Sequence, residues 1–89
     1  MKSQAIACRP LPSDAGQLTK RSLTIAGHRT SVSLEEPFWR ALTEIAAARK
    51  SSVAAVVAGI DRTRQARTNL SAAIRIFVLD WYRRQAKRG

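Results

Sequence analysis

The chain has 89 residues, enough for one small domain, and its 45% apolar content is sufficient for a folded core. Sixteen Lys and Arg residues against six Asp and Glu give a net charge of +10, which favours polyanionic partners such as nucleic acid or an anionic membrane surface. Cys8 is the single cysteine, so an internal disulfide is excluded, and no apolar run approaches the roughly 20 residues that span a bilayer. We therefore expect a soluble protein of the cytoplasm.

No group of residues in the sequence has the pattern of a catalytic or metal site. His28 is the single histidine, and no cysteine, aspartate or second histidine stands at metal-ligand spacing from it. The chain has no glycine-rich phosphate loop and no nucleophile motif, and its acidic residues are scattered. We expect a protein that is not an enzyme and that uses no metal or cofactor.

Two stretches on either side of Gly27 alternate apolar and polar residues, which is typical of β-strands. The apolar positions are odd in 22–26 and even in 29–34, so one regular strand would place them on opposite faces. A bulge or turn at Gly27 would absorb this shift. Residues 1–20 show no period and are expected to form a flexible tail. The basic residues of this tail, which can touch nucleic-acid phosphates, are Lys2, Arg9 and Lys20.

Three later stretches repeat apolar residues with the i, i+3, i+4, i+7 spacing of amphipathic helices. The first covers 35–49 and the second about 52–64, where Ser51 or Ser52 can cap the N-terminus. The third, at about 70–86, is apolar over so wide an arc that more than one of its sides should be covered. We expect this third helix to complete a core or to hold a protein partner.

The strand at 29–34 needs a partner for its backbone hydrogen-bonding groups. If it has none within its own chain, antiparallel pairing with a second copy about a two-fold axis supplies one and stacks four helices into a shared core. We expect that dimer core to consist of the apolar residues Val32, Leu34, Phe38, Leu42, Ile45, Val53, Val56, Val57 and Ile60.

Residues 29–42, with the sequence RTSVSLEEPFWRAL, resemble the strand and first helix of ribbon-helix-helix DNA-binding proteins such as the Arc and methionine repressors. Residues 50–60 resemble the turn and second helix of the same family. With 22–32 and 69–75 included, the chain is similar to a bacterial subgroup of uncharacterised proteins that carry this domain.

The resemblance implies a mainly α-helical fold with a short β-ribbon, assembled as an intertwined homodimer and extended by a C-terminal helix. The expected divisions of the chain are a flexible tail at 1–20, a ribbon-helix-helix domain at 21–64, and a linker, C-terminal helix and basic tail at 65–89.

In that family the two-stranded ribbon enters the DNA major groove, and outward-facing side chains read base edges. The resemblance and the strand period both assign Arg29, Ser31 and Ser33 to this role, with a solvated strand face as the alternative. For Arg29, a phosphate contact is also considered. The start of the second helix is expected to face phosphates, with a plain capped helix start as the alternative. Its candidate residues are Lys50, Ser51, Ser52 and Val53.

The leading hypothesis is therefore a dimeric, sequence-specific binder of double-stranded DNA that acts as a transcriptional regulator of the repressor type, associated with the nucleoid. The alternative is a protein-interaction module of the antitoxin type, whose C-terminal helix binds a partner. A membrane-surface peptide is disfavoured because a β-period and two further helices accompany the basic C-terminus. Trp39 and Trp81 are interpreted as packing residues and not as base-stacking ones.

Overall fold

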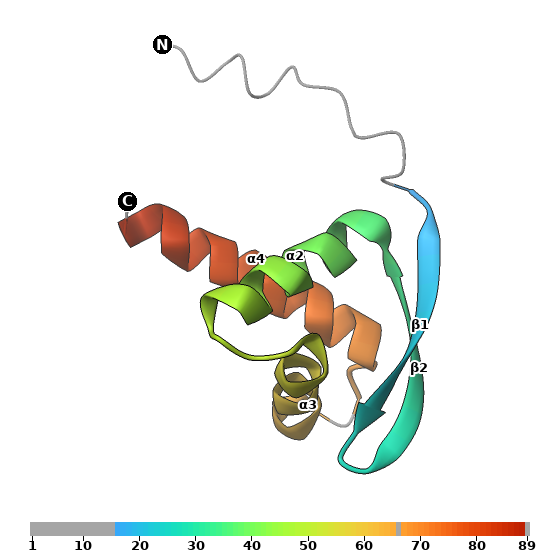
Figure 1. The fold of residues 1–89 in the computed structure, drawn as a ribbon. Helices are drawn as coiled ribbons and strands as arrows, with labels where there is room; N and C mark the ends of the chain where they lie inside the picture. Colours follow the sequence, from blue (N-terminus) through green and yellow to red (C-terminus); the bar gives the residue numbers. More distant parts are fainter. Residues whose placement is uncertain (1–15, 66, 89) are drawn as a thin grey trace.

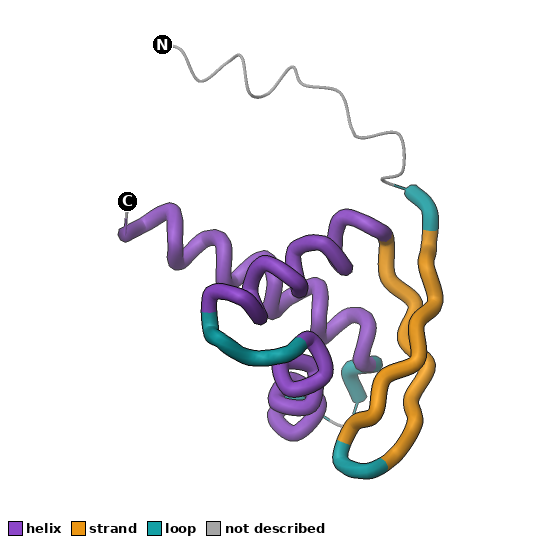
Figure 2. Tube along the Cα trace, viewed as in Figure 1, coloured by secondary structure: helices purple, strands orange, loops and turns teal. Residues whose placement is uncertain are grey.

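The computed structural model describes residues 16–65 and 67–88. Two strands, β1 (Leu18–Ile25) and β2 (His28–Glu35), are followed by the helices α2 (Glu36–Ala48), α3 (Val53–Thr63) and α4 (Leu70–Arg88). The strands form a ribbon on one side of the three helices (Figures 1 and 2). The predicted fold class, a short ribbon with helices and an extra C-terminal helix, is confirmed.

The strand that precedes the helices finds its partner within its own chain. β1 and β2 pair antiparallel, from Ile25 opposite His28 to Leu18 opposite Glu35. The condition under which the strand at 29–34 would borrow its partner from a second chain is therefore not met. β1 begins inside the stretch expected to be a tail, and the remainder of that expectation falls on residues 1–15, which lie outside the described residues.

The turn between the strands consists of Ala26 and Gly27, whose φ angles are +52° and +84°. Positive φ at both central residues is the signature of a type I′ turn, whose twist matches that of a two-stranded ribbon. Glycine adopts this conformation readily, whereas an alanine in the left-handed region costs roughly 1–2 kcal/mol. The turn therefore keeps this conformation although the backbone of Ala26 is strained.

One face of the ribbon packs on the helices and forms the edge of the core. Ile25, Val32 and Leu34 are buried there, at 5%, 2% and 0% exposed. The core continues through α2 and α3, and Trp39 is buried with its indole Nε1 donating to the carbonyl oxygen of Thr19 at 2.8 Å. This bond satisfies a buried donor that would otherwise lack a partner, and it holds α2 against β1.

The apolar residues expected to form a core between two chains form the core of one chain instead. Phe38 and Val53 are partly buried against it, and the others are buried within the single chain. A side chain with no exposed surface, such as Leu34 or Leu42, offers nothing to a second copy. The correction follows from the in-chain hairpin, which lets the helices close over their own ribbon.

α4 completes this core across α2 and α3. Its residues Ile74 and Val78 are 0% and 6% exposed. At its N-terminal end the Ser71 hydroxyl donates to the carbonyl oxygen of Ser33 at 3.0 Å. The Arg75 guanidinium binds both carboxylate oxygens of Glu35, at 2.9 and 3.2 Å, and this hydrogen bonding lowers the pKa of Glu35. These contacts hold the end of β2 against α4.

Replacing Ala26 by Asn should stabilise the protein, because Asn tolerates the left-handed conformation and Asn-Gly is a preferred type I′ pair. We expect the free energy of unfolding to rise by about 0.5–1 kcal/mol. Urea denaturation followed by circular dichroism measures it. Ala26→Val, which places a β-branched residue at the same positive φ, is the control and should lower stability. A stability unchanged in both variants would contradict the assigned turn.

Candidate nucleic-acid interface

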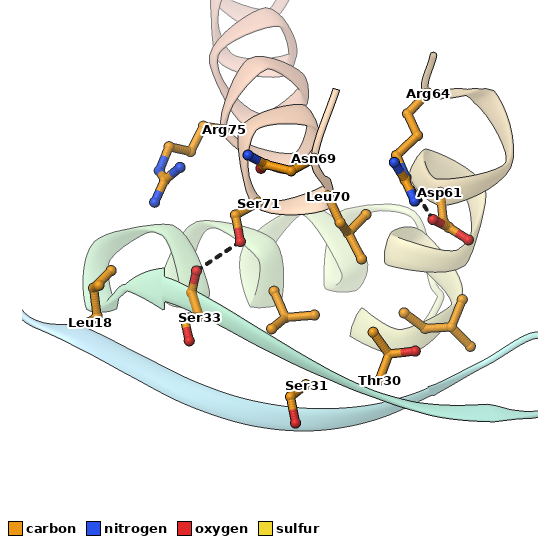
Figure 3. Close-up of a pocket in the computed structure, with 12 residues that line it drawn as sticks. Leu18, Thr30, Ser31, Ser33, Asp61, Arg64, Asn69, Leu70, Ser71 and Arg75 are labelled. Atoms are coloured by element: carbon orange, nitrogen blue, oxygen red, sulfur yellow. Dashed lines mark hydrogen bonds and ion pairs between the residues drawn. The ribbon is translucent and has the colours of Figure 1, made fainter. Parts of the chain in front are cut away.

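The outer face of the ribbon points away from the helices and is polar along most of its length. Three facing pairs form it, and Figure 3 shows the Ser31 and Ser33 side chains directed away from the helices. Ser33 is half-buried and the other five residues are exposed. A polar, exposed face opposite a buried one is the common arrangement of an antiparallel ribbon with one solvated side, and it leaves this side free to meet a ligand. The pairs are Lys20–Ser33, Ser22–Ser31 and Thr24–Arg29.

Sequence reasoning identified half of this face. Arg29, Ser31 and Ser33 lie where they were expected, on the outward side of β2. Ser22 and Thr24 were not expected there, and Lys20 was assigned to the tail. The available signal was that the apolar residues have odd numbers before Gly27 and even numbers after it. Residues that face each other across a two-residue turn always differ in this way, one odd and one even.

The three pairs contain no carboxylate, and the carboxylate of the next pair on the same side of the pleat, Leu18–Glu35, is bound by Arg75. The carboxylates elsewhere in the described chain also have partners. Glu36 binds Arg21 at 3.3 Å and Asp61 binds Arg64 at 2.8 Å. Further pairs join Glu35 to Arg75, Asp80 to Arg84, and Glu44 to the Tyr82 hydroxyl. The net positive charge of the chain is therefore carried by Lys and Arg residues outside these pairs. The cations without an ion pair in the described part of the chain include Lys20, Arg29, Arg49, Lys50, Arg62, Arg67, Arg83 and Lys87.

Arg21 lies on the inner face of the ribbon and is held by the core. Its guanidinium lies 5.0 Å from the centroid of the Trp39 ring and contacts Glu36. A cation engaged with both an aromatic ring and a carboxylate is poorly placed to bind an external anion. Arg21 is therefore a structural cation, in contrast to Lys20 beside it.

The start of α3 presents free backbone N–H groups. Ser52 is the N-cap, and its Oγ accepts from the N–H of Ala55 at 3.0 Å. The first intrahelical bond joins the N–H of Val56 to the Ser52 carbonyl. The N–H groups of Val53 and Ala54 therefore precede the helical hydrogen-bond ladder and can face an anion. Ala54 was not among the predicted residues.

Lys50 occupies a backbone position that usually belongs to glycine. Its φ is +54°, and its N–H donates to the Ala47 carbonyl while the N–H of Ser51 donates to the Ala46 carbonyl. This pair of bonds is the Schellman motif that ends α2. The backbone N–H of Ser51 is thus used by the cap, which leaves its hydroxyl for an external ligand. A lysine held at a strained position next to a helix start supports a functional role for its charge.

A model of the ribbon-helix-helix domain matches residues 18–82, which is most of the chain. The chain belongs to the ribbon-helix-helix family. Members of this family are generally DNA-binding regulators that bind DNA as dimers. None of the curated proteins matches the chain. It is similar to the solved structure of an uncharacterized protein from Bordetella pertussis Tohama I, with 27% identity and a TM-score of 0.76 over 98% of this chain and 73% of that one.

A groove of about 540 Å³ runs along the edge of β2 that does not face β1 (Figure 3). Its charged groups have partners within the chain: Arg64 binds Asp61 and the Thr68 carbonyl, and Arg75 binds Glu35. The groove of this ribbon-helix-helix chain therefore offers a ligand a shape and little free charge. Within residues 16–65 and 67–88, no helix is long and apolar enough to cross a membrane, and no three His, Cys, Asp or Glu residues gather as metal ligands.

Replacing Lys50 by Gly should move stability and DNA binding in opposite directions. Stability should rise by about 1 kcal/mol because glycine relieves the left-handed strain. Affinity for duplex DNA should fall and the slope of log affinity against log salt should decrease by about 1, as for one lost phosphate contact. Lys50→Ala is the control, since it removes the charge and keeps the strain. If Lys50→Gly keeps the wild-type affinity and salt slope, Lys50 does not contact phosphate.

Proposed function

We propose that this protein binds double-stranded DNA as a homodimer, places the outer face of its ribbon in the major groove and regulates transcription. The observation that supports this most strongly is the composition of that face. Six polar or cationic side chains lie on the exposed side of a ribbon whose other side is built into the core, and Glu35, the carboxylate at the end of that side, is bound by Arg75. A two-stranded ribbon fits the width of the major groove.

Individual residues of the face have different roles in this proposal. Arg29 donates to a guanine edge in bidentate fashion or to a phosphate. Ser31 and Ser33 donate and accept, so they discriminate between bases less strongly. Lys20, at the far end of the ribbon from the turn, binds phosphate and contributes to the salt dependence of the affinity.

The start of α3 is proposed to hold a phosphate beside the ribbon. The N–H groups of Val53 and Ala54 and the hydroxyls of Ser51 and Ser52 supply the donors, and Lys50 supplies the charge. Free N–H groups and the helix dipole both favour an anion at this place.

A dimer of this chain needs a surface other than the predicted shared core, because that core is covered within one chain. α4 offers exposed apolar side chains, with Ile76 at 63% and Leu79 at 59% exposed. An apolar groove beside them is lined by Phe38 and Tyr82. Exposed apolar residues that gather on one helix face favour contact with another protein surface. This feature also supports the second candidate function, a protein-interaction module of the antitoxin type.

Replacing Arg29 by Ala should weaken binding to a selected duplex by about 5- to 100-fold at fixed salt, the range expected for one lost bidentate base contact. The preferred sequence comes from selection on random duplexes, and fluorescence anisotropy measures the affinity. Arg67→Ala, which removes a cation from a loop outside the ribbon, is the control. Unchanged affinity and unchanged sequence preference in the Arg29 variant would refute the ribbon as the reading surface.

The double variant Ile76→Ser, Leu79→Ser tests the outer face of α4. Light scattering of the wild-type protein should give the mass of a dimer, and the variant should give that of a monomer with an unchanged circular dichroism spectrum. A variant that stays dimeric and binds DNA normally would contradict this face as the dimer contact, and would favour the second candidate function.

A further inference from the structure

The cations that lack an ion pair in the described part of the chain fall into two groups. Lys20 and Arg29 belong to the outer face of the ribbon. The others include Arg49 and Lys50 just after α2, Arg62 on α3, Arg67 in the loop before α4, and Arg83 and Lys87 in the second half of α4. The ribbon face and the proposed phosphate site at the start of α3, which includes Lys50, therefore account for the smaller share of these cations, and the larger share has no assigned partner.

Two of these cations, Arg49 and Arg62, line a groove, which we call the helical groove. It consists of two adjoining hollows of about 340 and 660 Å³ that share Arg49 and Phe77 as lining residues. Arg62 lines the first hollow, and Arg84 and Trp81 line the second. The rings of Phe77 and Trp81 are 6.4 Å apart, centroid to centroid, and form an apolar wall.

The electrostatics of the helical groove favour an anion. Asp80 is the one carboxylate among its lining residues, and it binds Arg84 at 2.8 Å. Arg49 and Arg62 have no ion pair within the described residues. The Arg62 guanidinium lies over Gly59, 3.7 Å from where a β-carbon would stand, so this side chain folds back along α3. Two guanidinium groups without an ion pair suit a phosphate backbone.

The helical groove lies away from the ribbon. α4 begins against β2 and runs away from it, and α2 ends on the same distant side (Figure 1). At 1.5 Å per residue, Arg84 lies roughly 20 Å further along the axis of α4 than its first residue. A straight duplex seated on the outer face of the ribbon would have to bend around the helices to reach Arg84, whereas Arg49 directly precedes Lys50 of the proposed phosphate site at the start of α3.

We propose that the helical groove binds the phosphate backbone of a second duplex, so that the protein bridges two DNA segments. The bridge rests on the proposed function, which supplies the first duplex at the ribbon. An anionic membrane is the less suitable occupant, because it requires apolar side chains exposed beside the cations, whereas Phe77 and Trp81 are partly buried against the core. The exposed Ile76 and Leu79 line neither hollow of the groove.

The test measures capture of a fluorescent duplex by the full-length protein loaded on a bead-bound duplex. The groove variant is Arg49→Ala, Arg62→Ala. The ribbon variant is Lys20→Ala, Arg29→Ala, and the charge-matched control is Arg67→Ala, Arg83→Ala, whose residues line neither hollow. The groove variant should bind a single duplex within about twofold of wild type and lose about tenfold in capture, since each surface contacts its own phosphates. The control should keep both activities.

Several outcomes would overturn the bridge. One is a wild-type protein that captures no second duplex. Another is a groove variant that captures the second duplex normally, which would mean that the two ribbon faces of a dimer hold the two duplexes. A loss of single-duplex binding in the groove variant as large as in the ribbon variant would mean that both surfaces grip one duplex. Binding to phosphatidylserine vesicles that the groove variant loses, without any DNA capture, would assign the groove to membranes. A ribbon variant with unchanged single-duplex affinity refutes the proposed function separately.

Discussion

The pairing of β1 with β2 inside one chain is the constraint on which the rest of the structure depends. It satisfies the backbone groups of both strands along one edge, so the ribbon exists before any second copy arrives. It also fixes which side chains face the helices. Once Ile25, Val32 and Leu34 point inward, the helices can close over them, and the outward face is determined at the same time.

Much of this arrangement could be predicted from the sequence, because periodicity reports directly on which face of an element is buried. The three helices lie within a few residues of their predicted limits, and Ser52 caps α3 as its position suggests. The pairing partner of β2 could not be predicted in the same way. A two-residue period shows which face of a strand is apolar and says nothing about which strand lies beside it.

The turn explains why the sequence left a bulge and a turn at Gly27 as equal alternatives. An Asn-Gly pair would have indicated a type I′ turn, whereas Ala26 conceals it, since alanine seldom adopts positive φ. The composition of the site could not be predicted for the same reason. Without the hairpin, nothing in the sequence placed Lys20, Ser22 and Thr24 on one face with Arg29. Ion pairs such as Glu35–Arg75, whose members stand 40 residues apart, are likewise decided by tertiary structure alone.

An in-chain ribbon also changes how the protein responds to dilution. When two chains must exchange strands to fold, folding is second order and the native state is lost as the protomer concentration falls. Here the ribbon closes as a unimolecular step through a two-residue loop, so its geometry is independent of copy number. At a few molecules per cell the ribbon of each molecule would therefore still be formed. A low concentration would limit assembly of the dimer and would not unfold the subunit.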